Sequence, residues 1–172
     1  VDGNTIYAAT WGGGLSISED GGQSWTTYNT ENSDLAHDEV LGVYADGNTI
    51  YAATFGGGLS ISEDGGQSWT TYNTSNSELG HDKVKDVYAD GNTVVAGTHG
   101  GGLSISEDGG QSWTTYDTLW PWIHRVYAAG NTIYAASHHE LFISEDGGQS
   151  WTSYNSENSD LAHDDFYAIY AD

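Results

Sequence analysis

The sequence SEDGGQSW occupies residues 18–25 and returns unchanged at 62–69, 106–113 and 144–151. The similarity extends beyond this motif, since residues 3–30 and 47–74 differ only where Trp11 is replaced by Phe55. The copies start roughly 40 residues apart, a period typical of four-stranded blades that stack around an axis. The chain is therefore built from four tandem copies of one unit.

Each unit contains four β-rich runs separated by turns that carry glycine. In the second unit these runs are VLGVYA (40–45), NTIYAAT (48–54), LSIS (59–62) and QSWTTY (67–72). Asp-Gly and Gly-Gly pairs between such runs favour tight reversals of the chain. A single unit cannot cover both of its own faces, so neighbouring units must stack. We predict an all-β fold, a four-bladed β-propeller of four-stranded antiparallel blades.

The two ends of the sequence are complementary. Val1 and Asp2 align with Ala45 and Asp46, so the first unit lacks its inner strand, whereas FYAIYAD at 166–172 is typical of an inner strand without a unit. We expect this C-terminal strand to pair with the N-terminal blade and close a single domain, 1–172, with blades at 1–39 plus 166–172, 40–83, 84–122 and 123–165. Pairing between molecules, in an eight-bladed dimer or an open polymer, is the alternative.

Charge and composition exclude several classes of partner. The 172 residues include 25 acidic and three basic side chains, for a net charge of −22, which opposes binding to nucleic acid. Without cysteine the chain has neither disulfides nor thiolate metal sites. No apolar run is long enough for membrane insertion. A surface rich in Ser, Thr, Asn and Tyr favours an extracellular or cell-surface location.

The repeated motif resembles the Asp-box of sialidase-like and sortilin-like propellers, also called the BNR repeat, with the pattern Ser-x-Asp-x-Gly-x-x-Trp. The resemblance implies a structural hairpin in which the Asp side chain accepts backbone N–H bonds, the glycines adopt positive φ and the Trp packs between blades. The Asp and Trp positions that carry it are Asp20, Asp64, Asp108 and Asp146, and Trp25, Trp69, Trp113 and Trp151.

An enzymatic role is not expected. Sialidases hold a substrate carboxylate with several arginines, whereas this chain has only Arg125. Because the units are nearly identical, no acid stands out as a catalytic carboxylate, and we assign no catalytic residue. No cofactor is expected either, although the sequence leaves open a bound divalent cation.

The positions at which the copies differ indicate a candidate binding face. They fall in two classes of loop that leave an up-and-down blade at the same end. In the first class are Trp11, Phe55, His99, His138 and His139, and in the second are His37, His81, His163, Trp120 and Trp122. Stacking on sugars, metal binding by His and Asp, and a purely structural role are the three interpretations.

The three basic residues, Lys83, Lys85 and Arg125, also fall in or next to two inner strands. Alignment of the repeats makes Asp86 equivalent to Arg125, which predicts an ion pair across adjacent blades.

Near-identical units suit repeated equal contacts better than one asymmetric active site. We therefore expect a non-catalytic extracellular structural or self-assembling interaction module, such as a subunit of a filament or surface array. The alternatives are a glycan-binding, lectin-like propeller that uses the divergent face and a propeller related to glycoside hydrolases. Self-association and a glycan are the expected partners.

Overall fold

The computed structural model describes residues 4–117 and 120–171, and every regular element within these ranges is a β-strand. The strands form four antiparallel sheets, one with three strands and three with four. The first sheet contains β1 (Ile6–Thr10), β2 (Gly14–Ser18) and β3 (Thr26–Tyr28). The second contains β4 (Val40–Asp46), β5 (Thr49–Thr54), β6 (Leu59–Ser62) and β7 (Thr70–Tyr72).

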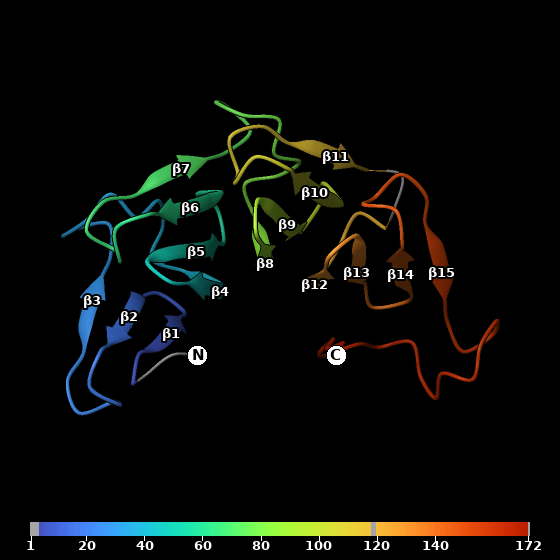
Figure 1. Ribbon diagram of the computed structural model, residues 1–172, viewed down its shortest axis with the longest axis horizontal. Coiled ribbons are helices and arrows are strands. Elements are labelled where there is room, and N and C mark those ends of the chain that lie inside the picture. Colours follow the sequence, from blue (N-terminus) through green and yellow to red (C-terminus); the bar gives the residue numbers. More distant parts are fainter. Residues whose placement is uncertain (1–3, 118–119, 172) are drawn as a thin grey trace.

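The third and fourth sheets repeat this order. The third contains β8 (Val84–Asp90), β9 (Thr93–Thr98), β10 (Leu103–Ser106) and β11 (Thr114–Tyr116). The fourth contains β12 (Arg125–Ala129), β13 (Thr132–Ala136), β14 (Leu141–Ser144) and β15 (Thr152–Tyr154). Figure 1 shows the sheets side by side along an arc, with β4, β8 and β12 on the inside and β3, β7, β11 and β15 on the outside. The predicted all-β fold with four propeller blades is confirmed.

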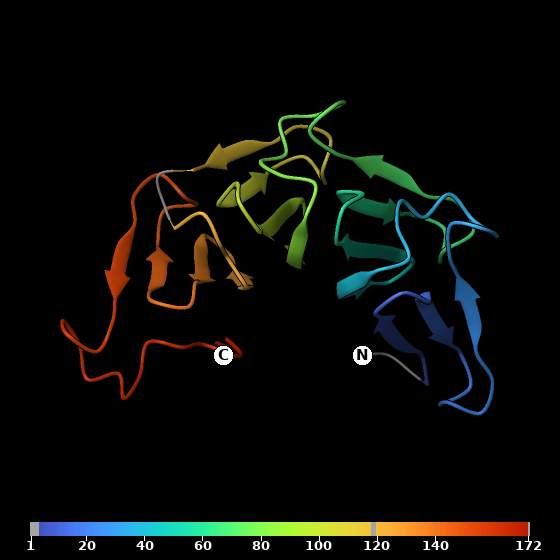
Figure 2. The same cartoon turned by 180° about the vertical axis from the view of Figure 1, so that it is seen from behind.

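The predicted closing pair is not formed. Among the described residues the first sheet has three strands, and residues 166–171 belong to none. This segment instead lies against β12, where the Arg125 Nε donates a hydrogen bond to the Tyr167 carbonyl at 2.8 Å. The C-terminal end and the first sheet face each other across the open side of the arc (Figure 2), so they are too far apart to pair. Val1, Asp2 and Asp172 lie outside the described residues.

A series of tyrosines shows which position residues 166–171 have taken. The rings of Tyr44 and Tyr88 on neighbouring inner strands have centroids 4.5 Å apart, and those of Tyr88 and Tyr127 are 4.4 Å apart. Tyr170 continues the series at 5.8 Å from Tyr127. The segment therefore lies where the inner strand of a further blade would lie.

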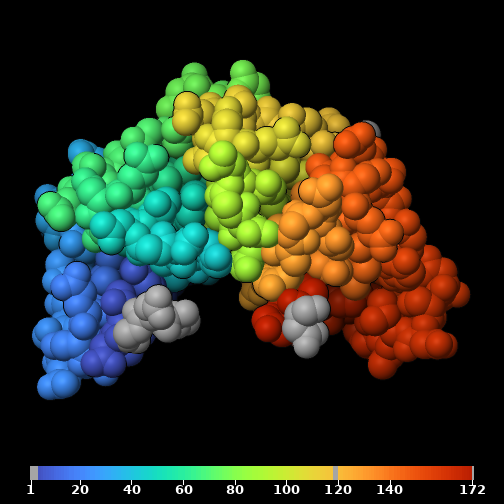
Figure 3. All heavy atoms as spheres, in the orientation of Figure 1, coloured from blue at the N-terminus to red at the C-terminus, as the bar shows by residue number. Residues whose placement is uncertain are grey.

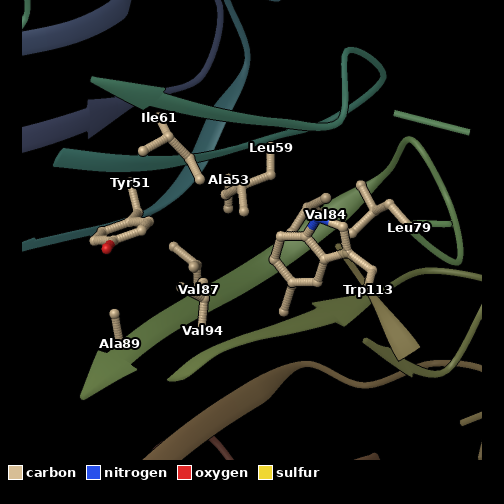
Figure 4. Close-up of a cluster of buried hydrophobic side chains, with 11 residues drawn as sticks. Tyr51, Ala53, Leu59, Ile61, Leu79, Val84, Val87, Ala89, Val94 and Trp113 are labelled. Carbon is tan, nitrogen blue, oxygen red and sulfur yellow. The ribbon is translucent and has the colours of Figure 1, made fainter. Parts of the chain in front are cut away.

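Over residues 4–117 and 120–171 the core consists of three apolar clusters, each made by two neighbouring blades. Figure 4 shows the cluster between the second and third blades, where Leu59 and Ile61 of β6 meet Val84 and Val87 of β8. Trp113, the last residue of the third copy of the motif, packs into the same cluster. The apolar face of a blade is therefore kept dry by the next blade and not by a second layer of its own.

The motif turns are held by the Asp side chain, as the sequence predicts. In the second blade the Asp64 Oδ1 accepts the Ser62 hydroxyl at 2.8 Å and the Ser68 backbone N–H at 2.9 Å, and its Oδ2 accepts the Ser68 hydroxyl at 2.6 Å. Gly65 and Gly66 follow with φ of 75° and 95°, which only glycine adopts easily. Hydrogen bonds from the Ser68 hydroxyl and backbone, and then from Ser62, lower the pKa of Asp64 to about 2.

We predict that Asp64→Asn is less stable than wild type near pH 6 and that this difference in the free energy of unfolding disappears in acid. The Asp64 pKa is about 2 in the folded chain and ordinarily 3.8. The stabilisation by the carboxylate is therefore complete above about pH 4 and disappears as the pH falls towards 2. The free energy of unfolding, measured by denaturant titration between about pH 2 and 6, should differ most between wild type and variant at the upper end of this range.

Glu63→Gln is the matched control, because it removes the charge of an adjacent exposed side chain that takes no part in the hydrogen bonds holding the turn. The difference in the free energy of unfolding between Glu63→Gln and wild type should not shrink in the same way as the pH falls from about 6 to 2. A stability difference for Asp64→Asn that is as large at pH 2 as at pH 6 would refute the proposed role of the charge.

Candidate binding site on the loop face

We call the end of the blades that carries the loops after β1, β5, β9 and β13 the loop face. Each of the first three loops is tied to the segment that enters the next blade. The backbone N–H groups of Gly12 and Gly14 donate to the Asp38 carbonyl at 3.0 and 2.8 Å, and Asp82 and Pro121 accept equivalent bonds. The motif turns lie at the opposite end, where the Gly65 N–H donates to the Asn48 carbonyl at 2.9 Å. The predicted separation of the two faces is confirmed.

Four rings from successive blades make one continuous row on the loop face, which we call the aromatic arc. Its ring centroids are 5.6 Å apart for Trp11 and Phe55, and 6.2 Å apart for Phe55 and His99. His99 and Trp122 follow at 5.9 Å. Trp11 is 69% exposed and Trp122 is 43% exposed, so the arc offers apolar ring surface to solvent. Isolated backbone bridges, such as that between Trp11 and Glu39, hold each ring in place.

Two further ring pairs extend this surface over the fourth blade. Trp120 packs edge-on against His139 at 5.0 Å, and His124 lies 3.9 Å from His138. The His138 Nδ1 is also 2.8 Å from the Asp165 Oδ1, and this contact lowers the pKa of Asp165. The structure thus brings the predicted residues Trp120, His138 and His139 next to the arc.

The remaining predicted histidines have a local structural role. The Nδ1 atoms of His37 and His81 accept the backbone N–H groups two residues later, of Glu39 and Lys83, both at 3.0 Å. His163 does the same with Asp165 at 3.1 Å. These rings hold the connections between blades. In residues 4–117 and 120–171, no three His, Cys, Asp or Glu side chains are grouped in a way that could hold a metal ion.

The basic residues gather behind the arc. The Lys83 Nζ lies 4.8 Å from the centre of the Phe55 ring and the Lys85 Nζ lies 5.4 Å from it, both within range of cation–π attraction. Burial and then Arg125 lower the pKa of Lys85, so the two cations are close. A chain with a net charge of −22 has therefore placed its few cations at one site.

The predicted ion pair between Asp86 and Arg125 is wrong. In the part of the chain that the structure describes, the only contact of ion-pair length is that of His138 with Asp165. The Asp86 Oδ2 accepts the Val126 backbone N–H at 3.0 Å, whereas Arg125 donates to the carbonyls of Tyr167 and His124. Backbone N–H and C=O groups beside the inner strands require hydrogen-bond partners, and here Asp86 and Arg125 each bond to such groups and not to each other.

His124 belongs to this cluster, although the sequence did not single it out. Burial, and then the positive charges of His138 and Lys85, lower its pKa from 6.5 to about 4. Its Nε2 is buried and has no hydrogen-bond partner among the described residues. The one available signal was its alignment with Lys85, which places both side chains at the same level of neighbouring inner strands.

Small grooves between blades lie away from this surface. One of them, of about 300 Å³, is lined by residues near the motif turns, including Ile61, Glu63, Tyr72 and Gly109. Similar grooves recur beside Ile105 and Ile143. The aromatic arc therefore lies on an open surface and lines none of these three grooves.

No family model matches this chain, and no curated protein sequence is significantly similar to it. Solved structures share its fold. The extracellular domain of a putative hybrid two-component system from B. thetaiotaomicron superimposes with a TM-score of 0.79 at 17% identity, over 96% of this chain and 23% of that one.

Two other neighbours differ in function. An ancestral GH74 enzyme gives a TM-score of 0.67 at 23% identity, over 87% of this chain and 22% of the enzyme. YCF48 bound to a D1 peptide gives 0.68 at 20% identity, over 91% and 53%. This chain thus spans from about a fifth to about half of the length of these β-propeller neighbours. The described residues include no helix that could cross a membrane.

We predict that the His124 imidazole stays neutral down to about pH 4. The folded pKa of about 4 lies below the ordinary 6.5, so the unfolded chain takes up this proton first, and the contribution of His124 to stability falls as the pH drops from 6.5 to 4. NMR titration of the histidine ring signals measures the pKa directly. Lys85→Gln should raise it towards 6.5.

Lys83→Gln is the control, since it removes an equal charge that does not contribute to the shift of His124. A wild-type His124 that titrates near 6.5, or equal responses to both lysine variants, would contradict the described electrostatics.

Proposed function

We propose that this chain is a non-catalytic, extracellular Asp-box propeller that binds carbohydrate through the aromatic arc. The observation that carries the proposal is the continuous row of Trp11, Phe55, His99 and Trp122 with its two exposed indoles. Indole and phenyl faces stack on the apolar C–H faces of sugar rings, while nearby polar groups bond the hydroxyls. Successive rings roughly 6 Å apart suit several sugar units of one chain better than a single small molecule.

The surroundings of the arc favour a ligand that carries carboxylates. Lys83 and Lys85 lie within about 6 Å of the Phe55 ring, and Arg125 is close to Lys85. Most of the surface is acidic and repels anions, so an acidic polysaccharide would be held at this face and excluded elsewhere. The ligand class we favour is therefore an oligosaccharide that contains uronic acid.

Three features support the non-catalytic and extracellular parts of the proposal. Arg125 is the only arginine, so the chain cannot assemble the cluster of arginines that resemblance to sialidases would require. The aromatic arc lies on an open surface and lines none of the three grooves described above, so they offer it no enclosed space for a reaction. Among the structural neighbours is an extracellular sensor domain, and the Ser- and Thr-rich composition fits such a location.

We expect saturable binding of an oligogalacturonate by isothermal titration calorimetry, and weaker binding of a neutral glucan oligosaccharide of equal length. Trp122→Ala should weaken the oligogalacturonate affinity about tenfold, because truncating an aromatic anchor commonly costs more than about 1 kcal/mol. Lys85→Gln should reduce the preference for the acidic ligand and leave the neutral one unaffected.

Glu63→Gln, at the opposite end of the blades, should bind like wild type. Equal affinity of wild type and Trp122→Ala, or no saturable binding of either oligosaccharide, would overturn the proposal.

A further inference from the structure

The first and fourth blades, at the two ends of the row of blades, expose apolar surface that is buried at the equivalent positions between blades. At the first blade, Ile6 is 42% exposed and Trp25 is 46% exposed. Their equivalents in the second blade, Ile50 and Trp69, are 0% and 8% exposed. The difference arises because the second blade packs against a preceding blade and the first does not.

The opposite end has the complementary defect. Leu141, Ile143 and Leu161 of the fourth blade are only half-buried, whereas the same positions in the first three blades are buried wherever they are leucine or isoleucine. Beside them, residues 166–171 lie in the place of the next inner strand, and Tyr170 is largely exposed. Within the part of the chain that the structure describes, no further blade covers this side of the fourth blade.

These two surfaces are the two halves of one interface that the chain already makes three times. Inside the chain, Gly66 lies against the preceding blade so closely that an added Cβ would be 3.2 Å from the Tyr28 ring and 3.3 Å from the Ile17 Cδ1. Trp69 meets the same Tyr28 edge-on at 6.4 Å. At the first blade, by contrast, the described residues that lie within 4 Å of a Cβ added at Gly22 are Ile6 and Trp25 of its own blade.

Repeat equivalence specifies what should fill the gap. Gly22 and Trp25 are equivalent to Gly66 and Trp69, and Ile143 and Tyr154 are equivalent to Ile17 and Tyr28. An incoming blade would therefore place Gly22 over Ile143, with Trp25 against the edge of Tyr154. Repeat equivalence also specifies how residues 166–171 would pair with β1 as an inner strand.

In the second blade, Val43 of β4 pairs with Ala52 of β5. Ile169 and Ala8 occupy the equivalent positions in residues 166–171 and in β1.

We propose that two copies of this chain close one eight-bladed ring, each donating residues 166–171 as the inner strand of the first blade of the other copy. The blades occupy one side of the axis, and the two complementary surfaces border the open side (Figure 3). A second copy related by a twofold axis meets both surfaces at once and leaves neither exposed. Closure within one chain would require the internal interfaces to change their angle, although each of them already buries an apolar cluster.

The two-copy ring also completes the loop face. Trp11 packs on Phe55 of the following blade, and His138 and His139 occupy the corresponding loop of the fourth blade. In the ring these histidines would lie beside Trp11 of the second copy, so that the two aromatic arcs join. This inference does not rest on the proposed ligand, since it is argued from the sides of the first and fourth blades and not from sugar binding.

A pair of introduced cysteines tests which copy supplies the strand. Directly opposite residues of antiparallel strands are close enough for a disulfide, and the chain has no cysteine of its own. Under oxidation Ala8→Cys/Ile169→Cys should give a covalent dimer on non-reducing gels. Val43→Cys/Ala52→Cys is the matched control within one complete blade and should give an oxidised monomer.

The result that would overturn the proposal is an oxidised monomer from Ala8→Cys/Ile169→Cys, which means closure within one chain. A ladder of larger species would equally overturn it in favour of an open polymer. Free thiols in this pair, together with a full disulfide in the control pair, would show that residues 166–171 do not enter the first blade of any copy.

The second experiment leaves the strand itself untouched. Ile143→Asp places a charge on the half-buried side of the fourth blade, so the chain should stay folded by circular dichroism while native mass spectrometry shifts from two copies to one. Thr70→Asp, on an exposed outer strand, adds the same charge and should remain dimeric. Wild type that is monomeric at tens of micromolar, or Ile143→Asp as dimeric as Thr70→Asp, would refute the proposed interface.

Discussion

Each blade has two apolar sides, and a side is buried from solvent only when another blade covers it. The rest of the structure depends on this contact. Isoleucine and tyrosine on one blade meet glycine and tryptophan on the next, as Ile17 and Tyr28 meet Gly66 and Trp69. The glycine is required because the facing ring comes within van der Waals distance of its missing side chain. Burial of such aromatic pairs supplies the main favourable term, since the strands themselves are only three to seven residues long.

The parts of the structure set by local chemistry could be predicted from the sequence. Asp64 holds its turn through groups within four residues, so the motif predicts that turn wherever it occurs. The strand pattern is equally local, because glycine and Asp-Gly turns delimit each run. The division into two faces follows from strand alternation alone, and it correctly gathered Trp11, Phe55, His99 and Trp122 at one end.

Features that depend on the angle between blades could not be predicted. Whether residues 166–171 reach the first blade depends on how sharply the arc curves, and that angle results from many side-chain contacts, no one of which determines it. The prediction of an ion pair between Asp86 and Arg125 was wrong for a related reason. Repeat alignment correctly placed Asp86 and Arg125 on adjacent strands, but the Val126 backbone N–H competed for the carboxylate. His124 was missed because its repeat equivalents, Leu41, Lys85 and Tyr167, are three different residues, so the alignment assigned no common role to this position.

The distribution of charge connects the assembly with the loop face. A net charge of −22 on each chain opposes the meeting of two copies, so an association of this kind must rely on apolar contact and should strengthen as salt screens the repulsion. The same acidity makes the small group of Lys83, Lys85 and Arg125 the one region of opposite sign. Lys85 and Arg125 lie on inner strands near the axis and Lys83 directly precedes one, so two copies would bring a second group around the same opening. An anionic ligand chain that crosses the opening could then contact both groups, and assembly would increase affinity without any new type of contact.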